Sequence, residues 1–195
     1  MILDLTVSDL IENTKSKKAN PGGGAVLSLV GVLGINLILM LDNLSKYEDM
    51  DTKKIDQSRK KLQELSERLK NTVEEDVNCY SEVTKAKKIK DEEIRKHRLN
   101  EGYKIANRPP MQTVEILLEA MQYINPILSY GNINVLSDGR IGLNLMYEAI
   151  ISSFYNIELN GRNIENFSYD FEKNYNLASS LKKQSEEIIT GRYQW

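Results

Sequence analysis

The chain is poor in the residues that form disulfides and metal clusters. It has one cysteine, Cys79, and one histidine, His97. A single cysteine cannot form an intramolecular disulfide, which favours a reducing compartment, and we expect a cytoplasmic protein. One residue of each kind cannot supply the ligands of a conventional zinc cluster, and we expect no metal site.

Residues that break the backbone are also few, and neither sign of charge is in large excess. Four prolines and eleven glycines in 195 residues favour a small number of long elements, and this length suits one domain spanning residues 1–195. The formal net charge of -2 creates no strong field, so we expect neither a nucleic acid nor a membrane partner. The opening residues, MILDLTVSDL, carry an acid where a signal peptide carries basic residues, and we expect no export signal.

What the chain does have is one long apolar stretch after a glycine-rich break. It reads NPGGGAVLSLVGVLGINLILMLDNLSK, residues 20–46, and predicts a helix from about Gly23 to Lys46. Such a helix is long enough to span a membrane, but Asn36 and Asp42 would be costly in lipid. No other segment is comparably apolar, so we expect this to be the central helix of a bundle or of a dimer.

A second long helix is predicted from about residue 52, with a heptad-like apolar stripe. One position breaks the stripe, because Asp76 stands where the repeat asks for an apolar side chain. A carboxylate at such a position must find a partner or raise its pKa, as a general acid or base does. A salt bridge to a neighbouring helix is the alternative. The repeat consists of Ile55, Leu62, Leu69 and Val83.

Helical periodicity dominates the rest of the chain, and no segment alternates as a strand does. We expect an all-α fold, a bundle of long helices around the buried apolar helix, dimerising through helices. The charged run 85–104 is expected to be a solvated face or a mobile connection. Further helices are expected after the cap residue Thr6, from Pro109 to Gly131 with a kink at Pro126, from Ser137 or Asp138, and over about 169–190.

A polar cluster joins two of these helices. In GNINVLSD, residues 131–138, the side chains of Asn132, Asn134, Ser137 and Asp138 fall close together in the sequence. A turn followed by a helix N-cap explains part of this composition. It does not explain two asparagines together with an acid, so we interpret the cluster as a candidate binding site.

Two further features supply candidate binding groups. The PGGG loop, residues 21–24, precedes a helix, so its backbone N–H groups could hold an anion, although it lacks the Lys-Ser/Thr of a nucleotide-binding P-loop. In NIELN, Asn156 and Asn160 are four positions apart and therefore share a helix face. Their amides would bond either to a ligand or to facing helices.

These stretches and their order resemble the cyclodeaminase/cyclohydrolase family, which includes the cyclodeaminase part of formiminotransferase-cyclodeaminase. The resemblance covers about residues 5–189. It implies an all-helical, cytosolic homodimer that binds a tetrahydrofolate-type small molecule and needs no metal or further cofactor. The stretches that carry it are NPGGGAVLSLVGVLGINLILMLDNLSK, Asp76 with Tyr80 four residues on, RPPMQTVEILLEA, GNINVLSDGRIGLNLMYEAI and NIELN.

The resemblance implies a folate one-carbon enzyme. Members of the family convert 5-formiminotetrahydrofolate to 5,10-methenyltetrahydrofolate with release of ammonia, and relatives hydrolyse 5,10-methenyltetrahydrofolate to 10-formyltetrahydrofolate. In either reaction Asp76 or Asp138 would move a proton and stabilise developing positive charge, and Lys46 would meet the folate glutamate. The other substrate-binding candidates are Pro21, Gly22, Gly23, Gly24, Asn132, Asn134, Ser137, Asn156 and Asn160.

The chain departs from the family pattern at the glycine loop. The family commonly has serine or threonine and proline before the triple glycine and serine after it, whereas here Asn20 precedes Pro21 and Ala25 follows Gly24. A hydroxyl that would contact ligand is therefore missing. Two alternatives to an active enzyme stay open, a catalytically silent folate-binding protein and a structural helical dimer. Cyclodeaminase and cyclohydrolase also both stay open, because the two reactions occur at the same carbon.

Overall fold

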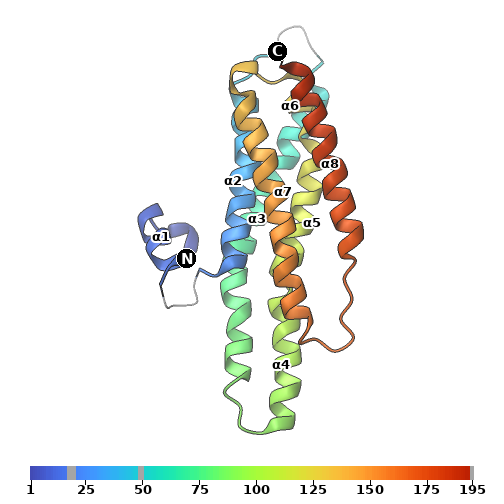
Figure 1. Ribbon diagram of the computed structural model, residues 1–195. Coiled ribbons are helices and arrows are strands. Elements are labelled where there is room, and N and C mark those ends of the chain that lie inside the picture. The colour runs from blue at the N-terminus through green and yellow to red at the C-terminus, as the bar shows by residue number, and fades with distance from the viewer. Residues whose placement is uncertain (17–20, 48–50, 194–195) are drawn as a thin grey trace.

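The computed structural model describes residues 1–16, 21–47 and 51–193. These residues form helices and no strands, so the predicted all-α fold is confirmed (Figure 1). The long helices lie side by side as a bundle, and the short helix α1 stands apart at one side. The helices are α1 (Val7–Thr14), α2 (Gly23–Asn43), α3 (Lys53–Ala86), α4 (Glu92–Ala106), α5 (Arg108–Tyr123), α6 (Asn125–Tyr130), α7 (Leu136–Gly161) and α8 (Phe171–Arg192), with short 3-10 turns η1 (Ile2–Asp4) and η2 (Ile133–Val135).

Helix α2 contributes one of its sides to the core of the bundle, as its apolar sequence predicts. It packs against α3, α5 and α7, and its neighbour α7 runs antiparallel to it (Figure 1). The backbones of α2 and α7 meet at two glycines. A Cβ added to Gly34 would lie 2.9 Å from the Gly142 carbonyl oxygen, and one added to Gly142 would lie 2.6 Å from the Gly34 carbonyl oxygen. Any larger residue at either position would separate the two helices.

One side of α2 and α7 remains exposed in the single chain. By length and composition alone α2 could cross a membrane, a test that core helices of water-soluble proteins also pass. On its outer side Leu33 is 51% exposed. Large apolar side chains of α7 continue this surface, which we call the α2–α7 face. Its most exposed members are Leu33, Leu44, Ile141, Tyr155 and Leu159.

Helices α3 and α4 form a hairpin whose tip projects beyond the other long helices (Figure 1). The charged run 85–104 is helical from Glu92 onward, capped by the Asp91 side chain, which accepts a hydrogen bond from the Ile94 N–H at 2.9 Å. A mobile connection is therefore wrong for that part. The solvated face is confirmed, because most charged side chains of the run are exposed.

Several predicted boundaries hold, and others shift. The Thr6 hydroxyl accepts a hydrogen bond from the Asp9 N–H at 3.1 Å, as an N-cap does. The kink expected at Pro126 is a full break, since α5 ends at Tyr123 before α6 begins. Helix α2 stops at Asn43, before its predicted end at Lys46, and α7 begins at Leu136, because η2 already turns the chain into the helical direction.

Candidate active site

A pocket of about 220 Å³ lies where the glycine loop enters α2. The first turn of α2 forms one wall, and α3, the junction of α4 with α5, and the last turns of α7 form the others. Six of the residues predicted to form a site meet here: Gly22, Gly23, Gly24, Asp76, Asn156 and Asn160. We call this the Asp76 pocket. Its remaining lining residues are Tyr80, Ala106, Pro110 and Leu159.

Asp76 is the ionisable group of the Asp76 pocket. Its Oδ2 accepts a hydrogen bond from the backbone N–H of Ala25 at 2.9 Å. Among the residues that the structure describes, no cation pairs with this carboxylate, so the alternative of a salt bridge is not supported. Burial raises the pKa of the Asp76 carboxyl, and the hydrogen bond from Ala25 lowers it by less. A carboxyl with a raised pKa can donate a proton to a bound molecule as well as accept one.

The glycine loop has to approach this carboxylate closely. A Cβ added to Gly24 would lie 2.2 Å from Asp76 Oδ1, a separation that no side chain can occupy. Gly23 has no neighbouring atom within 4 Å of the same position and faces open space. Ala25 is 1% exposed and does not line the pocket, and it contributes its backbone N–H. The hydroxyl missing at position 25 therefore does not leave a gap in the pocket wall.

Two asparagines of α7 supply the amide groups of the Asp76 pocket. Asn160 Nδ2 donates to the Ala106 carbonyl oxygen at 3.2 Å, which ties α7 to the end of α4. Within the described parts of the chain, neither the Asn156 amide nor Asn160 Oδ1 has a hydrogen-bond partner. Both can therefore bond to a ligand that enters beside Asp76. Tyr80 and Leu159 add exposed apolar surface at the same opening.

The second predicted cluster lies at the other end of α2. The Asn132 N–H donates to Ser45 Oγ at 2.7 Å, and Asn132 Nδ2 donates to the Leu44 carbonyl oxygen at 3.1 Å. Ala25 and Leu44 are roughly 28 Å apart along the helix axis at the usual rise per residue. One pocket of one chain therefore cannot hold both clusters. Pro21, next to the glycine loop, does not line the Asp76 pocket and lies against a separate hollow with Ile2 and Leu5. The other predicted residues away from the Asp76 pocket are Lys46, Asn132, Asn134, Ser137 and Asp138, and the roles of all six at a site stay predictions.

Residues 132–138, which we call segment 132–138, begin with a turn that is closed by a hydrogen bond within the segment. The Asn132 side-chain oxygen accepts a hydrogen bond from the Asn134 N–H at 3.0 Å and caps η2. The interpretation of this stretch as a turn with a cap is therefore confirmed for Asn132. Asn134 and Ser137 are exposed, and Asp138 is partly exposed, so their side chains remain available to another molecule.

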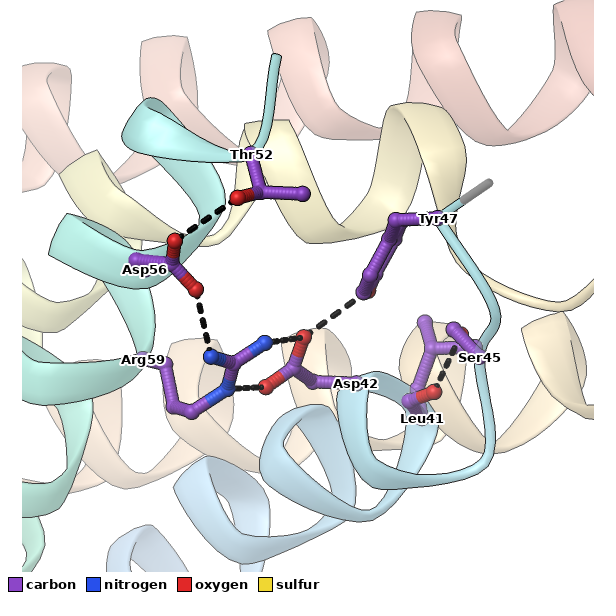
Figure 2. Close-up of polar contacts among 7 residues, drawn as sticks. All are labelled: Leu41, Asp42, Ser45, Tyr47, Thr52, Asp56 and Arg59. Atoms are coloured by element: carbon purple, nitrogen blue, oxygen red, sulfur yellow. Dashed lines mark hydrogen bonds and ion pairs between the residues drawn. The ribbon is translucent and has the colours of Figure 1, made fainter. Parts of the chain in front are cut away.

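A third polar cluster was missed by reasoning from the sequence. The Asp42 side chain is fully buried and pairs with Arg59 of α3 through both carboxylate oxygens (Figure 2). Tyr47 Oη donates to Asp42 Oδ1 at 2.8 Å, and Arg59 also reaches Asp56 at 2.6 Å. The signal in the sequence is an acid inside an apolar helix, and it predicts a buried partner as well as a cost in lipid. Among the residues that the structure describes, no group of three or more His, Cys, Asp and Glu side chains is placed to hold a metal ion.

Comparisons with known proteins place these features in a family. The family model described as formiminotransferase-cyclodeaminase matches residues 6–177. A methenyltetrahydrofolate cyclohydrolase of Methylorubrum extorquens is 24% identical over 177 residues, which are 86% of this chain and 85% of that protein. A formimidoyltransferase-cyclodeaminase of Mus musculus is 21% identical over 194 residues, which are 95% of this chain and 36% of the mouse protein. This chain therefore spans about a third of the length of the mouse relative.

A solved structure has the same fold. The crystal structure of formiminotetrahydrofolate cyclodeaminase from Thermotoga maritima superposes with a TM-score of 0.76 at 22% identity, covering 100% of this chain and 94% of that one. The resemblance drawn from the sequence motifs is thus confirmed. Because the family model matches most of its length, the chain belongs to the formiminotransferase-cyclodeaminase family.

Proposed function

We propose that this protein is a folate one-carbon enzyme, acting as a formiminotetrahydrofolate cyclodeaminase or as a methenyltetrahydrofolate cyclohydrolase. One observation carries the proposal: a partly buried carboxyl with a raised pKa and a single backbone partner stands in a pocket that also holds the unbonded amide of Asn156 and the unbonded amide oxygen of Asn160. The named relatives support the substrate class, since their names contain methenyltetrahydrofolate, formiminotetrahydrofolate and cyclodeaminase.

The Asp76 carboxyl suits the proton transfers that both reactions need. In the cyclodeaminase reaction, N10 forms a bond to the carbon of the formimino group, whose nitrogen is protonated, and N10 loses its own proton. The bond from this carbon to the former imino nitrogen then breaks as that nitrogen gains a proton and leaves as ammonia. Asp76 can accept the first proton and donate the second. In the cyclohydrolase reaction, water adds to the methenyl cation and loses a proton to the same carboxylate. The carboxyl then returns this proton to N5 as the bond from carbon to N5 breaks, and the hydroxyl oxygen loses its remaining proton to water and becomes the formyl carbonyl. The carboxylate also stabilises positive charge at this carbon.

The α2–α7 face supports a dimer in which each pocket is completed by the partner. The Asp76 pocket, with Leu159 on its wall, lies at one end of this face, and Leu44 and segment 132–138 lie at the other. A twofold axis across the middle of α2, near Leu33, pairs opposite ends of the two copies. Segment 132–138 of one protomer then adjoins the Asp76 pocket of its partner. Asn132, Ser137 and Asp138 would bind the same folate as Asp76, and Lys46 would approach its glutamate.

The remaining features of the proposal follow from composition and chemistry. With one cysteine and no possible internal disulfide, the protein is expected to work in the cytoplasm. Both reactions move only protons and a one-carbon unit that the substrate already carries, so the proposal requires no metal and no organic cofactor. The position of Ala25 outside the pocket wall favours an active enzyme over a catalytically silent folate-binding protein.

A spectrophotometric assay on two substrates tests the function. The methenyl species absorbs light, so its absorbance rises as 5-formiminotetrahydrofolate is converted and falls as 5,10-methenyltetrahydrofolate is hydrolysed. Enzyme-dependent change on one substrate identifies the reaction. No change on either substrate, with a protein that folds, refutes the enzyme. Thermal stabilisation by tetrahydrofolate compounds in that case would leave a silent folate-binding protein, and its absence would leave the structural dimer.

A further inference from the structure

The end of α2 holds a charge pair in an otherwise apolar helix. The Asp42 side chain is completely buried, whereas the Arg59 side chain is about one-third exposed. Arg59 Nε and Nη2 meet the two carboxylate oxygens as a fork, with Nη2 to Oδ1 at 3.1 Å (Figure 2). Such two-bond arginine–carboxylate pairs define the relative orientation of both side chains more strictly than a single bond does.

A buried pair of this kind is a poor device for stability alone. Removing two charges from water costs free energy that their attraction offsets only in part, and apolar residues of similar volume are often as stabilising. The pair needs another explanation, and its fixed geometry suggests one.

The pair holds the loop that follows α2. Tyr47 Oη donates to Asp42 Oδ1 at 2.8 Å, which draws loop 44–47 back over the helix end (Figure 2). Burial, and then the hydrogen bond to Asp42, raise the pKa of Tyr47 to about 12, so its hydroxyl keeps the proton that it donates. Asp56 Oδ2 accepts a hydrogen bond from the Thr52 hydroxyl at 2.8 Å, and Asp56 Oδ1 accepts one from Arg59 Nη1 at 2.6 Å. Arg59 is therefore held by a second carboxylate besides Asp42.

Loop 44–47 in turn holds segment 132–138. The two bonds from Asn132 end on this loop, at Ser45 Oγ and at the Leu44 carbonyl oxygen. Ser45 is itself oriented by its bond to the Leu41 carbonyl oxygen (Figure 2). A continuous set of hydrogen bonds and backbone links therefore runs from Arg59 to the start of segment 132–138.

We propose that Asp42, Arg59 and Tyr47 are positioning residues, which hold segment 132–138 in the place where it meets substrate. The inference rests on the proposed function, in which this segment completes the partner's Asp76 pocket. None of the three residues lines that pocket. Their substitution should therefore change how well the folate is bound and oriented, while the carboxylate that moves the proton stays in place.

The test replaces the pair without leaving a buried charge. In the double variant Asp42→Leu/Arg59→Met both charges are removed together, so Tm should change by less than about 4 °C. With the loop released, KM for the folate substrate should rise about tenfold or more, because small displacements of binding groups weaken orientation strongly. Tyr47→Phe keeps the pair and removes only its bond to the loop, and should raise KM by a smaller factor at unchanged Tm.

A second ion pair of α3 provides the matched control. Lys61 forms an ion pair with Glu119 of α5 at 2.9 Å. Neither residue belongs to the set of hydrogen bonds that holds loop 44–47. The variant Lys61→Met/Glu119→Leu should keep the wild-type KM. If the folded Asp42→Leu/Arg59→Met protein keeps the wild-type KM and kcat, the positioning role is refuted and the proposed function stands. If that variant does not fold, a wild-type KM in Tyr47→Phe refutes the role. A wild-type protein inactive on both substrates overturns the proposed function, and the positioning role with it.

Discussion

Gly24 stands so close to Asp76 that a methyl group in place of its hydrogen would lie 2.2 Å from the carboxylate Oδ1. The backbone of α2 thus begins directly against the one carboxylate that lines the pocket. Any movement of this loop moves the hydrogen bond from Ala25 to the same carboxylate. The glycine loop and the Asp76 carboxylate therefore form one structural unit.

Gly24→Ala should displace Asp76 and weaken both fold and catalysis. The added methyl group forces the carboxylate away from the Ala25 N–H, which should cost about 1–3 kcal/mol of the free energy of unfolding. We expect kcat to fall at least about tenfold. Denaturant unfolding and steady-state kinetics measure the two effects. Gly23→Ala is the control for stability, because no atom lies within 4 Å of its added Cβ. Equal stability of the two variants would contradict the close contact.

Asp76→Asn should remove proton transfer while keeping the shape of the pocket. The asparagine Oδ1 can still accept the hydrogen bond from Ala25, so the fold should persist. Loss of a general acid–base group should lower kcat by about 10²–10⁴-fold with a smaller change in KM. Glu75→Gln, the neighbouring and exposed acid of α3, is the matched control and should retain wild-type kcat. Wild-type kcat in Asp76→Asn would remove Asp76 from the mechanism.

The raised pKa of Asp76 predicts a specific pH dependence of stability. Because burial raises the pKa above its ordinary value of 3.8, the folded protein holds this proton where the unfolded chain has released it. The contribution of Asp76 to stability is therefore full below pH 3.8 and is lost as the pH rises through the folded pKa. Asp76→Asn cannot ionise and avoids this loss. Its Tm minus that of wild type should be more positive at pH 7 than at pH 4, and an unchanged difference would argue against a raised pKa.

Charge on the α2–α7 face should separate the proposed dimer. In Leu33→Asp a carboxylate replaces a half-exposed leucine near the proposed twofold axis, where two copies would bury two like charges. Sedimentation should show monomers, and kcat/KM should fall at least about tenfold because each pocket loses the partner's segment. Ile94→Asp, at a 55% exposed position of α4 outside this face, should stay dimeric and active. Full activity of a monomer would refute the shared site.

Much of the fold follows from local rules that act over a few residues. Helical spacing predicts the long helices, and the side chain of Thr6 caps α1 as its position suggests. The interrupted heptad identified Asp76, because a stripe that buries Leu69 and Val73 fully must also turn position 76 inward. The same spacing placed Asn156 and Asn160 on one face, where both line the pocket.

The rest depends on which distant segments meet, and local spacing does not carry that information. Motif composition grouped Asn132 with Asp76, but Asp76 bonds to the first turn of α2 and Asn132 to the loop that follows its last turn, so the two lie at opposite ends of α2. Arg59, the partner of Asp42, stands 17 residues away in the next helix. An acid in an apolar helix therefore indicates a free-energy cost of burial, but local spacing does not identify the residue that offsets it. Helix α4 was not predicted, because the charged run after Ala86 has too few apolar positions to show a periodic apolar face.

Arg192 has a consequence for the order in which the molecule is completed. It donates to the Leu128 and Gly131 carbonyl oxygens, each at 2.6 Å, and so closes the end of α6 where the turn toward Asn132 begins. Until the ribosome has added residue 192, this turn lacks the two hydrogen bonds from Arg192. The glycine loop and Asp76, by contrast, can meet once the first 76 residues and their neighbours have emerged. During synthesis the contact between the glycine loop and Asp76 can therefore form before the turn at Asn132 is closed, whereas the Asp76 pocket is complete only after Asn156 and Asn160 have been added.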